Sequence, residues 1–140
     1  MAKKILIIDG QGGRMGSRLV AAVKEKFPHC ELIAVGTNSI ATANMIKAGA
    51  EAAATGENAV IVNARRADVI VGPIGIVIAD ALLGEITPAM ATAVGQSDAE
   101  KFLLPVNKCN NHVVGVESLP VNAILEKTVA MIGDVVGAQV

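Results

Sequence analysis

The feature that most constrains the fold is a series of short runs rich in isoleucine and valine that recur along the whole chain. Continuous apolar runs of this length are typical of strands that are buried on both faces of a parallel sheet. We interpret residues 4–9, 32–35, 68–71, 102–106 and 112–116 as strands, and residues 51–55 could add a further short one.

Segments of helical composition separate these runs, and some carry helix-end signals. Thr87 followed by Pro88 is typical of a helix start, and Gly49 and Gly84 suit helix ends. Helices are expected over residues 13–27, 40–49, 57–65, 88–94 and 120–136. Strands that alternate with helices through short connections predict right-handed crossovers. The expected fold is therefore α/β, a Rossmann-like doubly wound, mostly parallel sheet with helices on both faces.

The first strand-to-helix connection is rich in glycine. Residues 5–16 read Ile-Leu-Ile-Ile-Asp-Gly-Gln-Gly-Gly-Arg-Met-Gly, so an apolar strand leads through this loop into a helix. Gly10, Gly13 and Gly16 lack the Cβ atom that would block a tight turn, a close pyrophosphate or close packing of helix on strand. Free amides at the start of the helix favour an anion. The pattern predicts a loop that binds the phosphates of a nucleotide.

Ligands of open parallel sheets lie beyond the carboxyl ends of the strands. The candidate cofactor-binding residues are therefore those of the loops after the strands: Asp9, Gly10, Gln11, Gly12, Gly13, Arg14, Met15, Gly16, Thr37, Asn38, Ser39, Gly72, Pro73, Gly75 and Asn107. For residues 72–75, a rigid turn is an equal alternative. No proline-rich or serine-rich linker divides the 140 residues, so we expect a single nucleotide-binding domain over residues 1–140.

Asp9 departs from the usual loop, because a carboxylate there would repel a pyrophosphate. It could accept hydrogen bonds from the loop amides, pair with Arg14, or hold a Mg²⁺ ion that bridges to phosphate. We favour the interpretation that Asp9 braces the loop.

The second strand lacks the acidic residue that dinucleotide-binding folds use to bind a ribose diol. Thr37, Asn38 and Ser39 offer hydroxyls and a carboxamide instead, which could bind a ribose or tolerate a 2′-phosphate. Alternatively, Asn38 or Ser39 caps the helix that follows. The predicted cofactor is NAD or NADP, without a choice between the two.

Residues 107–110 read Asn-Lys-Cys-Asn and follow an apolar run. Lys108 would favour the thiolate of Cys109, so these two residues are the candidates for a catalytic role, although a lone cysteine is more often a small buried side chain. We interpret Asp80 and Glu85 as structural. Two histidines and two cysteines at unsuitable spacings argue against a zinc site, and neither zinc nor haem is expected.

Composition argues against several classes of partner. The net charge is −1 and Phe27 and Phe102 are the only aromatic residues, so the clustered cations and stacking side chains of nucleic-acid-binding proteins are missing. The longest apolar stretch, residues 69–84, is interrupted by glycine and proline and is too short to span a membrane. The start of the chain has no signal-peptide pattern, so we expect a cytoplasmic protein. The apolar content of 52% favours a homodimer or homotetramer.

The glycine loop resembles that of a known enzyme family. Residues 10–16, Gly-Gln-Gly-Gly-Arg-Met-Gly, are similar to the nucleotide-binding loop of dihydrodipicolinate reductase. The resemblance implies that Gly10, Gly13, Arg14, Met15 and Gly16 wrap the pyrophosphate of NADPH or NADH. The catalytic residues of the reductase lie in a second domain that this chain lacks, so the resemblance does not imply its activity.

Over its full length the chain resembles a different family. Residues 36–42, 72–75 and 105–110 are similar to a bacterial family of short Rossmann-like proteins known as a domain of unknown function. This resemblance implies a stand-alone domain and no particular reaction.

Three functions are compatible with these features. The favoured hypothesis is a small module that binds NAD(P) or another adenine nucleotide. The alternative is a nicotinamide-dependent oxidoreductase completed by oligomerisation, which needs a proton donor that this tyrosine-free chain does not plainly show. The second alternative is a structural homo-oligomer without a ligand.

Overall fold

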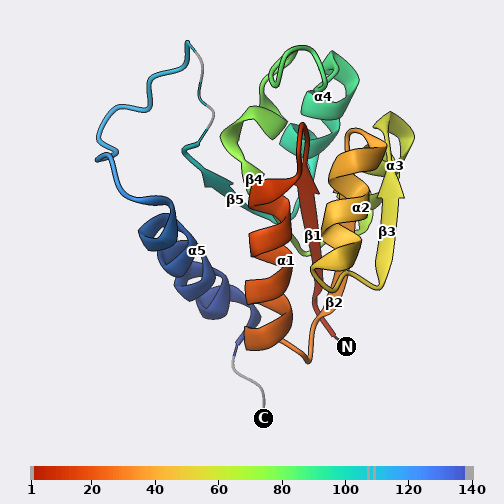
Figure 1. Ribbon diagram of the computed structural model, residues 1–140, viewed down its shortest axis with the longest axis vertical. Helices are drawn as coiled ribbons and strands as arrows, with labels where there is room; N and C mark the ends of the chain where they lie inside the picture. Colours follow the sequence, from red (N-terminus) through yellow and green to blue (C-terminus); the bar gives the residue numbers. More distant parts are fainter. Residues whose placement is uncertain (1, 107, 109, 138–140) are drawn as a thin grey trace.

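A five-stranded parallel sheet forms the centre of the computed structural model, which describes residues 2–106, 108 and 110–137 (Figure 1). The strands are β1 (Lys4–Asp9), β2 (Glu31–Gly36), β3 (Ala52–Thr55), β4 (Val69–Pro73) and β5 (Glu100–Leu104). Their order in the sheet is β3-β2-β1-β4-β5, and every neighbouring pair is parallel. From β1 the chain adds β2 and β3 on one side and then β4 and β5 on the other, so the strand order switches between β1 and β4. Ligands of such sheets bind at that switch point.

Helices cover both faces of the sheet (Figure 1). Packed on one face are α1 (Arg14–Lys26), α2 (Ser39–Lys47) and α5 (Val121–Val136), and on the other are α3 (Glu57–Arg66), the 3-10 helix η1 (Ile74–Val77) and α4 (Pro88–Gln96). In β1, Ile5 and Ile7 join the first core, whereas Leu6 and Ile8 join the second. The continuous apolar run therefore reflects burial on both faces of the strand.

The expected α/β class is confirmed, and most elements lie where the sequence predicted them. Residues 51–55 do contribute a strand, β3, and β5 begins and ends slightly earlier than predicted. The prediction of a strand over residues 112–116 is wrong, because these residues form turn and irregular structure and Val114 is 97% exposed. Gly115, at a φ of 87°, interrupts any extended conformation there.

The helix-end signals are confirmed in part. The hydroxyl of Thr87 accepts a hydrogen bond from the amide of Met90, and Gly49 follows α2 with a φ of 124°. Gly84 instead lies in a turn before α4, so its assignment to a helix end is wrong. None of the helices in the described part of the chain has the length and apolar character that a membrane crossing needs.

Candidate functional site

The carboxylate of Asp9 braces the glycine loop from inside. The side chain is only 4% exposed, and its Oδ1 and Oδ2 atoms accept hydrogen bonds from the amides of Gly10 at 2.8 Å and Gly16 at 2.6 Å. Gly13, which precedes α1, has no side chain that could cap the helix. Asp9 therefore supplies the acceptor that an N-cap side chain normally provides. The bracing interpretation is confirmed.

Close packing fixes two of the loop glycines. Gly13 has a φ of 70°, and a Cβ atom there would lie 2.7 Å from the Cα atom of Ala41. At Gly16 a Cβ atom would lie 2.6 Å from the sulfur of Met45. Gly12 differs, because nothing lies within 4 Å of the position of its Cβ atom. A side chain therefore fits at position 12 and not at position 13 or 16.

The start of α1 keeps unused hydrogen-bond donors. The described residues offer no acceptor to the amides of Gly12, Arg14 and Met15. The first amides of a helix lack intrahelical partners and carry the positive end of its dipole. Because Gly12 and Arg14 are exposed, these amides and the guanidinium of Arg14 can meet an anion from solvent.

A second carboxylate, that of Glu85, reaches the loop from the segment between η1 and α4. Its Oε1 atom accepts hydrogen bonds from the amide of Gln11 at 2.8 Å, the hydroxyl of Thr37 at 2.6 Å and the carboxamide of Asn38 at 2.8 Å. Asn38 also caps α2 by accepting from the amide of Ala41, as one of the two interpretations predicted. Glu85 thus joins the loops that follow β1 and β2.

The turn that carries Glu85 has an uncommon backbone. Asp80, Leu82 and Leu83 have φ angles of 66°, 56° and 56°, in the left-handed region that L-residues rarely adopt. The amide of Asp80 donates to the carbonyl of Ile86 at 2.7 Å, which closes the turn. Residues in such conformations persist only where their surroundings hold them, and they are frequent at ligand-binding sites.

The pKa values of the two carboxyl groups are shifted in opposite directions. Burial raises the pKa of Asp9 above its ordinary 3.8, against the hydrogen bonds from Gly16 and Gly10, and the charge of Glu85 adds to the increase. Burial also acts to raise the pKa of Glu85, but the hydrogen bonds from Thr37, Gln11 and Asn38 outweigh it, so the pKa lies below 4.5. Glu85 is therefore charged at neutral pH, and three donors surround one anionic oxygen.

The predicted site residues at the end of β4 and the start of η1 are buried in the protein interior. Gly72, Pro73 and Gly75 are buried, and a Cβ atom at Gly72 would collide with the carbonyl oxygen of Ile8. At Gly75 a Cβ atom would lie 3.2 Å from the Cβ atom of Ala81. Close packing therefore accounts for both glycines, which favours the rigid-turn interpretation of this segment.

Other predicted residues contribute less to the cluster. Ser39 is exposed at the first position of α2, and Lys108 is half-buried in the connection after β5. Asn107 and Cys109, which the sequence suggested for cofactor binding and catalysis, lie outside the described residues. No group of three or more metal-ligating side chains gathers within the part of the chain that the structure describes.

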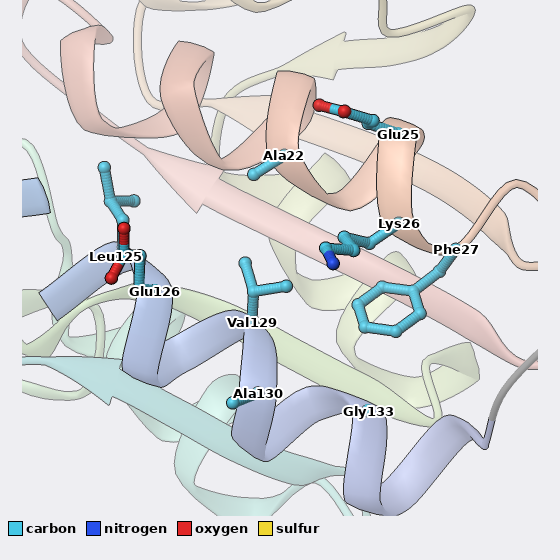
Figure 2. Close-up of a pocket in the computed structure, with 9 residues that line it drawn as sticks. All are labelled: Ala22, Glu25, Lys26, Phe27, Leu125, Glu126, Val129, Ala130 and Gly133. Carbon is cyan, nitrogen blue, oxygen red and sulfur yellow. The ribbon is translucent and has the colours of Figure 1, made fainter. Parts of the chain in front are cut away.

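A groove elsewhere on the molecule is unrelated to this site. Figure 2 shows it between α1 and α5. Its volume is about 590 Å³. Its lining residues are Ala22, Glu25, Lys26, Phe27, Leu125, Glu126, Val129, Ala130 and Gly133. They include the C-terminal end of α1, whereas the glycine loop precedes the opposite end of that helix.

Sequence reasoning did not place Glu85 beside the glycine loop, because 74 residues separate it from Gln11. The hydrogen bonds by which it joins the two loops agree with the structural interpretation of this residue. The sequence carries only an indirect signal for this contact. Thr37 and Asn38 offer hydrogen-bond donors at the position where an acidic residue is usual, so an acidic side chain from another segment can accept their hydrogen bonds.

Comparisons with known proteins found one family that matches nearly the whole chain. The family model described as a domain of unknown function, DUF3842, matches residues 4–137. None of the curated proteins matches the chain. Among solved structures, a universal stress protein in complex with cAMP is similar, with 20% identity and a TM-score of 0.42. That similarity covers 74% of this chain and 97% of the universal stress protein.

Proposed function

Since this chain belongs to the DUF3842 family of unknown function, we propose a function from its own geometry: it binds a nucleotide, whose phosphates contact the start of α1. The residues that hold the phosphates in this proposal are the amides of Gly12, Arg14 and Met15 and the side chain of Arg14. The ligand is a small molecule, and the favoured class is NAD(P) or another adenine nucleotide.

The observation that carries this proposal is the set of free donors at the switch point of the sheet. Asp9 accepts hydrogen bonds from the amides of Gly10 and Gly16. The amides of Gly12, Arg14 and Met15 have no acceptor among the described residues. Helix amides at such a position favour phosphate oxygens through hydrogen bonds and through the helix dipole. The open space at Gly12 leaves room for the phosphate.

Thermal unfolding in the presence of candidate ligands tests the proposal. The probes are inorganic pyrophosphate, ATP, NAD⁺, NADP⁺, FAD and coenzyme A. A ligand at a hundred times its Kd stabilises the folded state by about 2.7 kcal/mol, so a true ligand raises the Tm measurably. Calorimetry then measures the Kd of each probe that raises the Tm.

A pair of variants at position 12 supplies the control. Gly12→Glu places a carboxylate among the free amides, whereas Gly12→Gln places a neutral side chain of the same size there. We expect the first variant to lose the Tm response and the second to retain it. A response that survives Gly12→Glu would place the ligand elsewhere and overturn this site. Gly13 is unsuitable for this purpose, because its packing against Ala41 admits no side chain.

One observation favours a second candidate function, a structural homo-oligomer without a ligand. Carboxylates of the chain itself already accept hydrogen bonds from the amides of Gly10, Gln11 and Gly16. In that case no probe changes the Tm of the wild-type protein or of the position-12 variants. Sedimentation measures the homodimer or homotetramer that this function requires, and a monomer of 14.3 kDa would exclude it.

A further inference from the structure

Three donors around one oxygen form the part of the cluster that phosphate binding at α1 does not explain. The amide of Gln11, the hydroxyl of Thr37 and the carboxamide of Asn38 all point at the Oε1 atom of Glu85. Two of them follow β2, where dinucleotide-binding folds place the ribose and its substituents. Donors alone suit an anionic oxygen better than a ribose diol, which also needs an acceptor.

We propose that Glu85 is an internal competitor of the ligand: its carboxylate occupies the position of a phosphate oxygen of the nucleotide, which binds by displacing it. This inference rests on the nucleotide-binding function proposed above and adds to it the class of ligand and its regulation. The ligand is a nucleotide with an anionic oxygen that can take the place of the Glu85 carboxylate. This oxygen belongs either to the phosphates held at α1 or to a further phosphate of the same nucleotide.

The turn that carries Glu85 also covers the loop. A Cβ atom at Gly10 would lie 2.9 Å from the Cδ1 atom of Leu82 and 3.0 Å from the Oε1 atom of Glu85. A ligand that approaches Gly10 therefore meets both side chains. Three residues of this turn have left-handed backbones, so the arrangement that places Glu85 on the loop carries strain.

The position already tolerates a negative charge. Glu85 is close enough to Asp9 for its charge to raise the pKa of that buried carboxyl, and three hydrogen bonds still keep Glu85 ionised. A phosphate oxygen that replaces Glu85 would gain the same three donors and meet the same charge on Asp9. Exchange of one anion for another leaves the balance of charges in the cluster nearly unchanged.

Calorimetric titration of Glu85 variants with inorganic pyrophosphate, NAD⁺ and NADP⁺ tests the inference. We expect Glu85→Ala to bind at least one probe about tenfold more tightly than wild type. In this variant the ligand no longer has to displace a carboxylate, so the binding-competent state is more highly populated. Glu85→Gln keeps the size of the side chain and removes its charge, so we expect a Kd between those of wild type and Glu85→Ala. This second variant also tests the effect if the alanine variant folds poorly.

Control variants separate this effect from a change in net charge. Glu25→Gln removes one negative charge from the exposed surface of α1, far from the loop, and its Kd values should equal those of wild type. In the Glu85→Ala background, Gly12→Glu should abolish the tighter binding. Tighter binding of NADP⁺ alone assigns the displacing oxygen to a ribose phosphate, whereas tighter binding of all three probes assigns it to the pyrophosphate.

The contrary outcomes are distinct. Wild-type binding that is unchanged or weakened in both Glu85 variants would overturn the competitor role and leave nucleotide binding intact. Absence of binding in wild type and in both Glu85 variants would overturn the proposed function itself.

Discussion

The Oδ2 atom of Asp9 accepts a hydrogen bond of 2.6 Å from the amide of Gly16, so the last residue of β1 is joined to the first turn of α1. With its other oxygen, Asp9 accepts from the amide of Gly10, at the beginning of the same loop. One buried carboxylate therefore holds both ends of the glycine loop. Between them, the amides of Gly12, Arg14 and Met15 have no acceptor among the described residues, whereas those of Gln11 and Gly13 donate to Glu85 and to the carbonyl of Gly10.

Asp9→Asn should destabilise the protein, because the new amide group presents a donor to one of two backbone amides. A buried donor that loses its acceptor costs about 1–3 kcal/mol. Urea unfolding followed by circular dichroism measures the change. Asp68→Asn is the matched control, since Asp68 accepts a hydrogen bond from the amide of Lys4 at an exposed position and its loss should cost less.

Gly16→Ala should also destabilise, although alanine is the better helix former. The added Cβ atom would lie 2.6 Å from the sulfur of Met45 and 2.7 Å from the Cβ atom of Asp9, and overpacking of this kind costs about 1–3 kcal/mol. Gly95→Ala in α4 is the control, because nothing lies within 4 Å of its added atom. That variant should gain up to about 1 kcal/mol from helix propensity. Equal effects at the two positions would contradict the close packing at Gly16.

Leu83→Gly should stabilise the turn that carries Glu85. Leu83 is 93% exposed and has a φ of 56°, so glycine removes a left-handed conformation that costs about 1–2 kcal/mol and loses little packing. Part of this gain is offset by the greater entropy of glycine in the unfolded chain. Val114→Gly, at an equally exposed position without a positive φ, should not stabilise. Chemical denaturation compares the two.

Stability should depend on pH through Glu85. Its pKa in the folded protein lies below the ordinary 4.5, so its contribution is complete above pH 4.5 and is lost as the pH falls through the folded-state pKa. Glu85→Gln should therefore flatten the loss of stability on the acid side of pH 4.5. Free energies of unfolding from urea titrations between pH 3 and pH 7 would show no such flattening if the three hydrogen bonds were absent in solution.

The contribution of Asp9 to stability should change with pH in the opposite direction. Because its folded-state pKa is raised above 3.8, the folded protein binds the proton more tightly than the unfolded chain does. The ionisation of Asp9 thus lowers stability as the pH rises from 3.8 through the raised pKa. The same titrations on Asp9→Asn should lack this component, and a wild-type curve that already lacks it would show that the pKa of Asp9 is not raised.

Sequence patterns located most elements because local signals and burial agree along this chain. The residues between Lys4 and Asp9 are apolar on both faces, as a central parallel strand requires, and Thr87 with Pro88 marks the start of α4. The strand predicted over residues 112–116 is wrong because its apolar composition is not matched by burial. An apolar run forms a strand only where a neighbouring strand is available for its hydrogen bonds, and composition does not report that neighbour.

Sequence patterns alone were enough to predict the α/β class, the position of the glycine loop and the bracing role favoured for Asp9, because each follows from signals within short segments or from their order along the chain. Only the tertiary structure brought Glu85 to Gln11, Thr37 and Asn38, through a turn whose left-handed residues no local motif marks. The physical reason is that hydrogen bonds between distant segments follow from the packing of β1, β2 and the turn before α4. The carboxylate that Thr37 and Asn38 contact thus comes from the segment between η1 and α4.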